Sequence, residues 1–364
     1  MEEVNKTNED LGYNSFFETG REKSELANFP VARVMVEYRG AYKVKNADHT
    51  YLAKVTGKRM FEAETREDFP AVGDWVAISE ADENQAVIQG ILPRRTIIKR
   101  RSNGKNAVQI IAANIDVVLV VEAVDRDFNL NRLERYFAIA KDGGVRPAII
   151  LNKVDLISAD ELESRRTQIK DRFGEVDVIF TSNITDEGLD ELRKYIKKGQ
   201  TYCFLGSSGV GKSSLINKLL GENMIRTEEV SLGSDRGKHT TTNREMYFLA
   251  GGGIVIDNPG MREVGMTDVE AGIDDLFAEI AALARQCRYV DCTHVHEPGC
   301  AILSAVQAGQ VDDQKYANYL RLKKEAEHYE LIETEKREKD RQFGKFLKKA
   351  KKDLGDYGHK NYGQ

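Results

Sequence analysis

Several features are missing from this sequence of 364 residues, and each absence excludes a class of protein. It has no run of about 18 apolar residues, so we expect no transmembrane helix and no membrane partner. The N-terminus is acidic and polar and lacks the apolar region of a signal peptide, which predicts a cytoplasmic protein. Only four cysteines are present, and in a cytoplasmic chain they are not expected to form disulfides.

A net positive charge is also missing: the formal charge is −5, which gives no overall indication of nucleic-acid binding. Two local basic runs are nevertheless present. Such runs most often form a solvated surface, and a phosphate backbone is the alternative partner. The first consists of Arg94, Arg95, Lys99, Arg100, Arg101 and Lys105, and the second of Lys345, Lys348, Lys349, Lys351 and Lys352. We expect a monomer.

The N-terminal part of the chain divides into a polar and a strand-rich segment. Residues 1–28 are polar and poorly patterned, which predicts a flexible arm. Residues 29–103 contain about five short alternating strands separated by turns with glycine, typical of an OB-type β-barrel. An SH3-like barrel would give nearly the same pattern. Trp75 is expected in the barrel core, although stacking on a nucleic-acid base is an alternative.

The pattern changes over residues 104–265. Continuous apolar runs alternate with amphipathic helical segments, which predicts an α/β domain with a parallel sheet and helices on both faces. Strands are predicted at 115–121, 146–151, 176–180, 201–205 and 253–257. Residues 266–364 are predicted to be mainly helical, with Asp274 and Asp275 capping one helix and charged helices from about residue 301 to 352.

A phosphate-binding loop of the form GxxxxGKS follows the strand at 201–205. Its glycines let backbone N–H groups surround a phosphate, and the next helix adds its positive N-terminus. Lys212 is expected to reach the β- and γ-phosphates and to act in catalysis, and Ser213 to bind Mg²⁺. The predicted nucleotide-binding residues here are Gly206, Ser207, Ser208, Gly209, Val210, Gly211, Lys212, Ser213 and Ser214.

A second motif, of the form NKxD, lies upstream at residues 152–155. The carboxylate of Asp155 can accept hydrogen bonds from N1–H and N2–H₂ of guanine, which adenine lacks, so it would select GTP over ATP. Asn152 is expected to order the loop and contact the base, and the Lys153 stem to pack over the base plane. Thr181, Ser182 and Asn183, after the next strand, fit the backbone element that contacts guanine O6, with Ser182 as the predicted binding residue.

Two further elements are predicted to sense the terminal phosphate. Asp257 and Gly260 form a DxxG motif, in which Asp257 holds Mg²⁺ through water and Gly260 binds the γ-phosphate. Thr241, in a run of three threonines, is expected to bind Mg²⁺. The glutamine that orients the attacking water in Ras-like enzymes is replaced by Met261, which cannot do so. His239 is the catalytic candidate, and a loop histidine without a catalytic role is the alternative.

Three of the four cysteines fall within fourteen residues, a spacing typical of a metal site. Three thiolates and one imidazole would form a closed tetrahedral Zn²⁺ site, whose role is structural because no ligand position stays open. His296 is a competing ligand. The predicted zinc ligands are Cys287, Cys292, His294 and Cys300.

The order of the motifs is unusual, because ordinary GTPases carry the phosphate loop before the guanine motif. The chain thus resembles a circularly permuted GTPase, and over about residues 30–330 it is identified as a member of the RsgA or YjeQ family. The motifs that carry this resemblance, besides the permuted order, are Gly237–Thr242, Asp257–Glu263 and Cys287–Cys300. The family usually has Asp-Thr-Pro-Gly-Phe, where this chain has Asn258 and Met261.

The resemblance implies an OB-fold domain, a permuted P-loop GTPase domain and a C-terminal zinc domain. It also implies hydrolysis of GTP to GDP, stimulated by the 30S ribosomal subunit during its late maturation, with the OB and zinc domains contacting 16S rRNA. Two alternatives remain: a GTP-switched RNA-binding module with incidental hydrolysis, favoured by Met261, and an ATP-dependent RNA factor.

Overall fold

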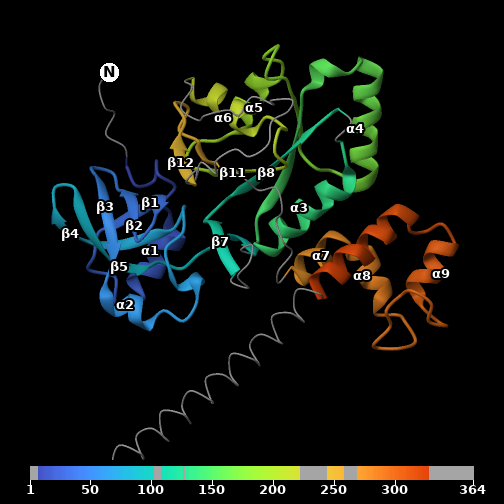
Figure 1. The fold of residues 1–364 in the computed structure, drawn as a ribbon, viewed down its shortest axis with the longest axis horizontal. Coiled ribbons are helices and arrows are strands. Elements are labelled where there is room, and N and C mark those ends of the chain that lie inside the picture. The colour runs from blue at the N-terminus through green and yellow to red at the C-terminus, as the bar shows by residue number, and fades with distance from the viewer. Residues whose placement is uncertain (1–6, 102–107, 126–127, 222–243, 258–268, 328–364) are drawn as a thin grey trace, which may run out of the picture.

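The computed structural model describes residues 7–101, 108–125, 128–221, 244–257 and 269–327. Figure 1 shows an N-terminal β-barrel in blue, a central sheet covered by helices, and a C-terminal group of helices in orange. No helix in these ranges is long and apolar enough to span a bilayer.

Five strands close the N-terminal barrel. Their order is β1-β2-β3-β5-β4, and β4 pairs back to β1. The β3–β5 pair is parallel and the other pairs are antiparallel, which is the Greek-key order of an OB fold and confirms that prediction over the SH3-like alternative. The strands are β1 (Val31–Tyr38), β2 (Ala41–Lys45), β3 (Thr50–Val55), β4 (Trp75–Asp82) and β5 (Gln85–Ile91); helices α2 (Gly57–Glu62) and η1 (Arg66–Asp68) lie between β3 and β4.

The segment before the barrel differs from the flexible arm predicted for residues 1–28. It contains helix α1 (Ser15–Glu22), and Leu11 and Phe17 are buried in one apolar cluster with Trp75. The Trp75 side chain is therefore in the core, as predicted. The prediction of an arm was wrong over the described residues because a few apolar side chains suffice to cover one side of the barrel, without a periodic pattern.

A hairpin joins the barrel to the central sheet. Its strands, β6 (Ile97–Arg101) and β7 (Val108–Ala113), pair antiparallel. The domain boundary predicted between residues 103 and 104 falls inside this hairpin, so it divides two strands that fold together. Turn-forming and charged residues dominate the sequence here, so the sequence does not predict that these two strands pair.

The first basic run is less available to a phosphate backbone than its composition indicates. Three of its cations form ion pairs within the chain, at 2.7 Å for Arg94 and 3.0 Å for Lys99. The carboxylate of Asp74 is buried, so its bidentate pair with Arg94 holds the barrel together. The three pairs are Arg94–Asp74, Arg95–Asp116 and Lys99–Glu67.

The central sheet has the order β10-β9-β8-β11-β13-β12, and it is parallel except for β12. Alternate residues of β8 face two different apolar clusters, so both faces of the sheet are buried. At its outer edge β12 pairs with β1 of the barrel, where Val36 lies opposite Glu245. The strands are β8 (Val117–Ala123), β9 (Arg146–Asn152), β10 (Val178–Thr181), β11 (Thr201–Leu205), β12 (Glu245–Phe248) and β13 (Ile254–Asp257).

Helices cover both faces of the sheet, as predicted. One face packs against α3 and α4 through Leu133 and Ile169, and the other against α5 and α6 through Leu192 and Leu215. The helices are α3 (Leu130–Asp142), α4 (Ala159–Phe173), α5 (Leu189–Tyr195) and α6 (Lys212–Leu220), with the short η2 (Val154–Leu156) after β9.

The described part of the C-terminal region, residues 269–327, is mainly helical. Its helices are α7 (Glu270–Leu276), α8 (Ala278–Ala284), α9 (Ala301–Gln307) and a helical segment at residues 313–327. Asp274 and Asp275 lie inside α7, so the prediction that they cap a helix was wrong; they form ion pairs with Lys323 and Lys141 instead.

Candidate active site

Three motifs meet at one edge of the central sheet. The residue Asn152 ends β9, the phosphate loop follows β11, and Asp257 ends β13. Because these strands are parallel, their carboxyl ends lie at the same edge, where open α/β sheets bind their ligands. The topology thus brings together motifs that are up to about a hundred residues apart in sequence.

The phosphate loop needs glycine at two positions. Gly206 and Gly211 have φ angles of 144° and 98°, which disfavour a side chain. A Cβ at Gly206 would lie 2.2 Å from the carbonyl oxygen of Val121, and one at Gly211 would lie 2.3 Å from Nδ2 of Asn152. The backbone at both ends of the loop is therefore held against neighbouring elements.

Lys212 is folded back over the loop that precedes it. Its Nζ donates hydrogen bonds to the carbonyl oxygens of Gly206 and Ser207 at 2.9 and 2.6 Å. Burial lowers the pKa of Lys212 to about 8, and the nearby carboxylate of Asp257, itself only 4% exposed, opposes that shift. An anionic phosphate in the loop would replace the two carbonyls and favour the charged ammonium.

Asn152 connects the guanine motif to the phosphate loop. Its buried side chain donates from Nδ2 to the carbonyl oxygen of Val210 at 2.7 Å and accepts at Oδ1 from the Thr181 hydroxyl at 3.0 Å. Asn183 adds a hydrogen bond to the carbonyl oxygen of Gly211 at 3.3 Å. The base-reading and phosphate-binding loops are therefore held in one fixed arrangement.

The remaining guanine-motif residues form polar contacts at the same edge of the sheet. The Ser182 hydroxyl donates to Oδ1 of Asp155. Lys153 has a left-handed backbone with φ 67°, and its ammonium lies 3.2 Å from a carboxylate oxygen of Asp125. Sequence reasoning missed Asp125, whose only signal is a polar side chain just after the carboxyl end of β8, and it gave Thr181 no role of its own.

Ser213 and Ser214 lie in the first turn of α6, which begins at Lys212, and Ser208 and Gly209 form a turn of the loop after Ser207. The predicted residues His239, Thr241 and Gly260 lie outside the described residues, as does Met261.

The four predicted zinc ligands come together in the C-terminal region. Their ligand atoms all lie within 4.8 Å of one another. The Sγ atoms of Cys287 and Cys300 are 3.8 Å apart, and Nδ1 of His294 is 3.5 and 3.6 Å from them. A tetrahedral Zn²⁺ with its usual bond lengths has S···S and S···N separations of about 3.8 and 3.5 Å, so the cluster fits this ion.

Local interactions hold the metal cluster in shape. The backbone carbonyl of His294 accepts a hydrogen bond from the Tyr316 hydroxyl at 2.7 Å, and burial lowers the pKa of His294, which favours the neutral imidazole that a metal needs. The Glu297 carboxylate accepts from the backbone amides of Thr293, Val295 and His296. The imidazole of His296, the competing ligand, is not part of the cluster.

Together, a phosphate loop and an upstream guanine motif at the carboxyl edge of one sheet define a circularly permuted GTPase. The chain belongs to the RsgA GTPase family, which matches residues 91–267. A second family, the 50S ribosome-binding GTPases, matches residues 201–352, starting at β11.

Individual relatives agree with this assignment. The chain is 42% identical to the small ribosomal subunit biogenesis GTPase RsgA 2 of Lactiplantibacillus plantarum, over 83% of this chain and 84% of that one. It is 37% identical to RsgA 1 of Bacteroides thetaiotaomicron, over 90% and 92%. Among solved structures, YjeQ from Thermotoga maritima matches with a TM-score of 0.60 at 26% identity, covering 80% of this chain and 96% of that one. The circularly permuted GTPase YloQ shares the fold with a TM-score of 0.59 at 20% identity, covering 84% and 97%.

Proposed function

We propose that this GTPase hydrolyses GTP in the biogenesis of the small ribosomal subunit, that the 30S subunit stimulates the reaction, and that the chain contacts 16S rRNA late in maturation. The relatives at 37–42% identity are named as small ribosomal subunit biogenesis GTPases, and they align with most of the chain. This role places the protein in the cytoplasm, acting as a monomer on the subunit.

The observation that carries the GTPase part is the side chain of Asn152, which bonds the phosphate loop through the carbonyl oxygen of Val210. This hydrogen bond holds the base-reading loop and the phosphate loop at a fixed distance from each other. A nucleotide with the wrong base would therefore bind less well at the base-reading loop and at the phosphate loop. Asp155 supplies the guanine-specific acceptor, and its present partner, the Ser182 hydroxyl, orients the carboxylate.

Each residue of the phosphate site has a separate task. The Lys212 ammonium leaves the loop carbonyls and neutralises charge on the β- and γ-phosphates. Ser213 and Asp257 would hold Mg²⁺, which neutralises phosphate charge when it is bound. We assign to Thr241 a magnesium contact, to Gly260 a hydrogen bond to the γ-phosphate, and to His239 the orientation of the attacking water.

The Cys287–Cys300 cluster would hold one structural Zn²⁺. Its four ligands leave no open position, so the ion stabilises a region with few apolar residues and takes no part in hydrolysis.

The test is GTP turnover by the purified chain with and without 30S subunits. We expect slow turnover alone and a strong increase with subunits, which Lys212→Ala abolishes and which His239→Ala reduces while GDP affinity stays nearly constant. Turnover that 30S leaves unchanged over a range of salt concentrations would refute the proposal and favour the GTP-switched RNA-binding module. ATP that displaces GDP at comparable concentration would refute the role of Asp155.

A further inference from the structure

A carboxylate from outside the sequence motifs contacts the guanine motif at the edge of the sheet. Asp125 follows the end of β8 by two residues, and its Oδ2 lies 3.2 Å from the ammonium nitrogen of Lys153. The two residues are 28 positions apart in the sequence. Lys153, the second residue of the guanine motif, therefore has an anionic partner on a neighbouring strand.

The sheet fixes the backbone at both ends of this ion pair. In the parallel β8–β9 pair, Ala123 lies opposite Asn152, and the amide of Val124 donates to the carbonyl oxygen of Asn152 at 3.0 Å. Asp125 and Lys153 are the next residue on each strand, so they leave the sheet side by side. Their separation is set by the strand pairing and does not depend on a bound nucleotide.

The backbone of Lys153 also sets the direction in which its side chain starts. Its φ of 67° is in the left-handed region, which is uncommon for a residue with a side chain and is often found at functional sites. Directly after it, the amide of Leu156 donates to the Lys153 carbonyl at 3.0 Å and closes the turn that carries Asp155. The Lys153 side chain is thus restricted by the turn at its base and by Asp125 at its tip.

Restriction of a lysine side chain affects ligand binding more than folding. The side chains of Lys153 and Asp125 are 30% and 25% exposed, and ion pairs that water reaches contribute little to stability. A flexible four-carbon stem, however, loses rotational freedom when it packs against a ligand, and that loss weakens binding. If the stem is already held in place, less freedom remains to be lost.

We propose that Asp125 is a positioning residue for the nucleotide base: it holds the Lys153 ammonium so that the stem lies along the face of the guanine ring. This proposal rests on the proposed placement of Lys153 over the base plane. Asp155 reads the edge of the base, whereas the Lys153 stem contacts its face. Asp125 therefore increases the affinity for the ring without changing the choice between related bases.

The test is calorimetric titration of the full-length chain with GDP, inosine diphosphate and pyrophosphate, each with Mg²⁺. Asp125→Asn should weaken GDP and inosine diphosphate by the same factor, about two- to tenfold, the cost of immobilising one long side chain. Pyrophosphate has no base and should keep its affinity. Asp125→Glu retains the carboxylate and should recover part of the loss. Equal weakening of pyrophosphate and GDP would show a general disturbance of the site and overturn the proposal.

A double-mutant cycle tests whether Asp125 acts through Lys153. Lys153→Met keeps most of the stem but removes the ammonium, so it should weaken GDP about as much as Asp125→Asn. Asp125→Asn should then have no further effect in the Lys153→Met background, because the interaction that it removes is already absent. Independent losses that add in the double variant would overturn the proposal.

The matched control is Asp116→Asn, at the opposite end of β8. Asp116 also pairs with a cation, Arg95, and accepts from the backbone amide of Thr201 at 2.7 Å, but it lies at the amino edge of the sheet. Its loss should lower the midpoint of thermal unfolding and leave GDP affinity within about twofold of the wild-type value. Equal losses of GDP affinity in Asp116→Asn and Asp125→Asn would mean that both pairs are only structural.

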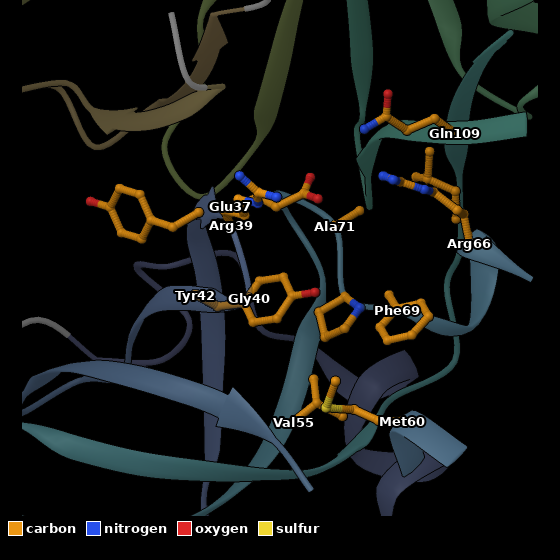
Figure 2. Close-up of a pocket in the computed structure, with 13 residues that line it drawn as sticks. Glu37, Arg39, Gly40, Tyr42, Val55, Met60, Arg66, Phe69, Ala71 and Gln109 are labelled. Atoms are coloured by element: carbon orange, nitrogen blue, oxygen red, sulfur yellow. The ribbon is translucent and has the colours of Figure 1, made fainter. Parts of the chain in front are cut away.

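Lys153→Ala separates this proposal from the proposed function. Unchanged GDP affinity in Lys153→Ala would refute the placement of Lys153 over the base, and the role of Asp125 with it. Weakened GDP binding in Lys153→Ala, together with wild-type binding in Asp125→Asn, would reject the role of Asp125 alone. Nucleotide bound in the barrel pocket of about 320 Å³ that Figure 2 shows would not respond to Lys153, because no guanine-motif residue lines that pocket.

Discussion

The barrel and the C-terminal region are attached to the GTPase domain in different ways. The barrel has its own apolar interior, which includes Val34, Val44 and Ile88. The C-terminal helices have none in the described chain: their buried residues, such as Ile273 and Leu322, belong to the same cluster as one face of the central sheet. Only part of the barrel, including Met35 and Val36 of β1, belongs to that cluster. We therefore expect the barrel to unfold more independently of the GTPase domain than the C-terminal helices, which share their core with α3.

The GTPase domain meets the barrel at one junction and the C-terminal helices at the other. The polar contacts at these two junctions also differ. Glu134 on α3 forms a bidentate pair with Arg172, at 2.6 and 3.0 Å, and accepts from Asn318 in the C-terminal helical segment. At the barrel, β1 meets β12 at one residue pair, and Arg33 donates to oxygens of several segments, including Thr201 at the start of β11. We therefore expect less relative motion at the shared core than at the barrel junction.

The largest test of this comparison is removal of the Zn²⁺ that we propose for the Cys287–Cys300 cluster. Chelation should loosen the Cys287–Cys300 loop, and because its helices share a core with α3, protection of α3 against hydrogen exchange should fall while that of β2 to β5 stays unchanged. Structural zinc in small domains contributes roughly 10 kcal/mol or more, so the loss should be large. Hydrogen-exchange mass spectrometry with and without chelator measures it.

A matched pair of variants controls that experiment. His294→Ala should mimic chelation, and His296→Ala, which changes a neighbouring histidine outside the cluster, should not. Equal loss of protection in the barrel and in α3 would show that the two junctions do not differ.

Glu134→Gln should give the next largest effect. The Glu134 and Arg172 side chains are 1% and 8% exposed, and loss of one charge leaves the other buried without its main partner. We expect a loss of about 3 kcal/mol, at the lower end for buried pairs because Asp312 still contacts Arg172. The matched control is Glu325→Gln, whose pair with Arg135 is partly exposed and should contribute less than about 1 kcal/mol. Hydrogen exchange of α3 and residues 313–327 measures the loss of stability in both variants. Similar losses for Glu134→Gln and Glu325→Gln would contradict the expectation.

Arg33→Met tests the other junction. The fully buried guanidinium donates to the carbonyl oxygens of Leu11, Gly73 and Asn114, at 3.3 Å for Gly73 and 3.2 Å for Asn114, and to the Thr201 hydroxyl at 2.8 Å. Methionine fills similar space but leaves these acceptors unsatisfied, which should cost about 2 kcal/mol.

The loss from Arg33→Met should be confined to the barrel and its contact with β11, with residues 313–327 unaffected. The control is Arg39→Met at an exposed arginine of the same barrel, which should change stability by less than about 0.5 kcal/mol. Reduced exchange protection throughout the chain would mean that the barrel is not a separate unit.

At the nucleotide site, between the two junctions, we expect stability and GDP affinity to depend on pH through Lys212. Burial depresses the pKa of Lys212 from 10.5 to about 8, so the folded chain without nucleotide binds that proton less tightly than the unfolded chain. Its stability should therefore increase as pH rises from about 8 towards 10.5. Phosphate favours the ammonium, so GDP binding takes up a proton, and its affinity should fall by up to about tenfold per pH unit above 8.

Calorimetric titration of GDP at pH 7, 8 and 9, in buffers of different ionisation enthalpy, measures how many protons the chain takes up when GDP binds. Lys212→Arg keeps a charge that does not titrate in this range, so any remaining affinity should be flat with pH. Proton uptake that survives this substitution would assign it to another group.

Sequence reasoning was strongest where the chemistry is local in the chain. Glycines at 206 and 211, the lysine after them and the Cys287–Cys300 spacing are readable because each motif performs its task within a few residues. The OB-type barrel and the parallel sheet followed from period and order. The parallel β3–β5 pair distinguishes the OB fold from an SH3-like barrel, and no local sequence pattern predicts that pairing.

What the sequence did not reveal depends on contacts between distant residues. Arg33 bonds Thr201 across 168 positions, and Glu134 contacts Asn318 across 184. Strand β12 was missed because four residues carry too little periodicity, and α1 because its apolar side chains are few. The ion pairs of the first basic run were invisible for the same reason: their acidic partners are elsewhere in the chain.

The smallest expected effect concerns communication across the barrel junction. Arg244 begins the described segment after residues 222–243 and contacts Glu37 of β1 at 3.7 Å and the Gln109 side-chain oxygen of β7 at 3.2 Å. The next residue, Glu245, lies opposite Asp257 in the β12–β13 pair. The barrel and the nucleotide site are thus joined by a short chain of contacts, so a nucleotide that favours one arrangement of this junction should change the local stability of the barrel.

We expect the hydrogen-exchange protection of β1 and β2 to differ by about two- to fivefold, or about 0.5–1 kcal/mol, between the GDP-bound chain and the chain with a non-hydrolysable GTP analogue. Arg244→Ala should remove most of this difference. The control is Arg135→Ala, which breaks an ion pair at the C-terminal junction and should leave the difference intact, because that junction moves with α3 as one unit. A nucleotide effect on the protection of β1 and β2 that Arg135→Ala abolishes and Arg244→Ala preserves would reverse the comparison and make the shared core, rather than the barrel contact, the route from the nucleotide site to the barrel.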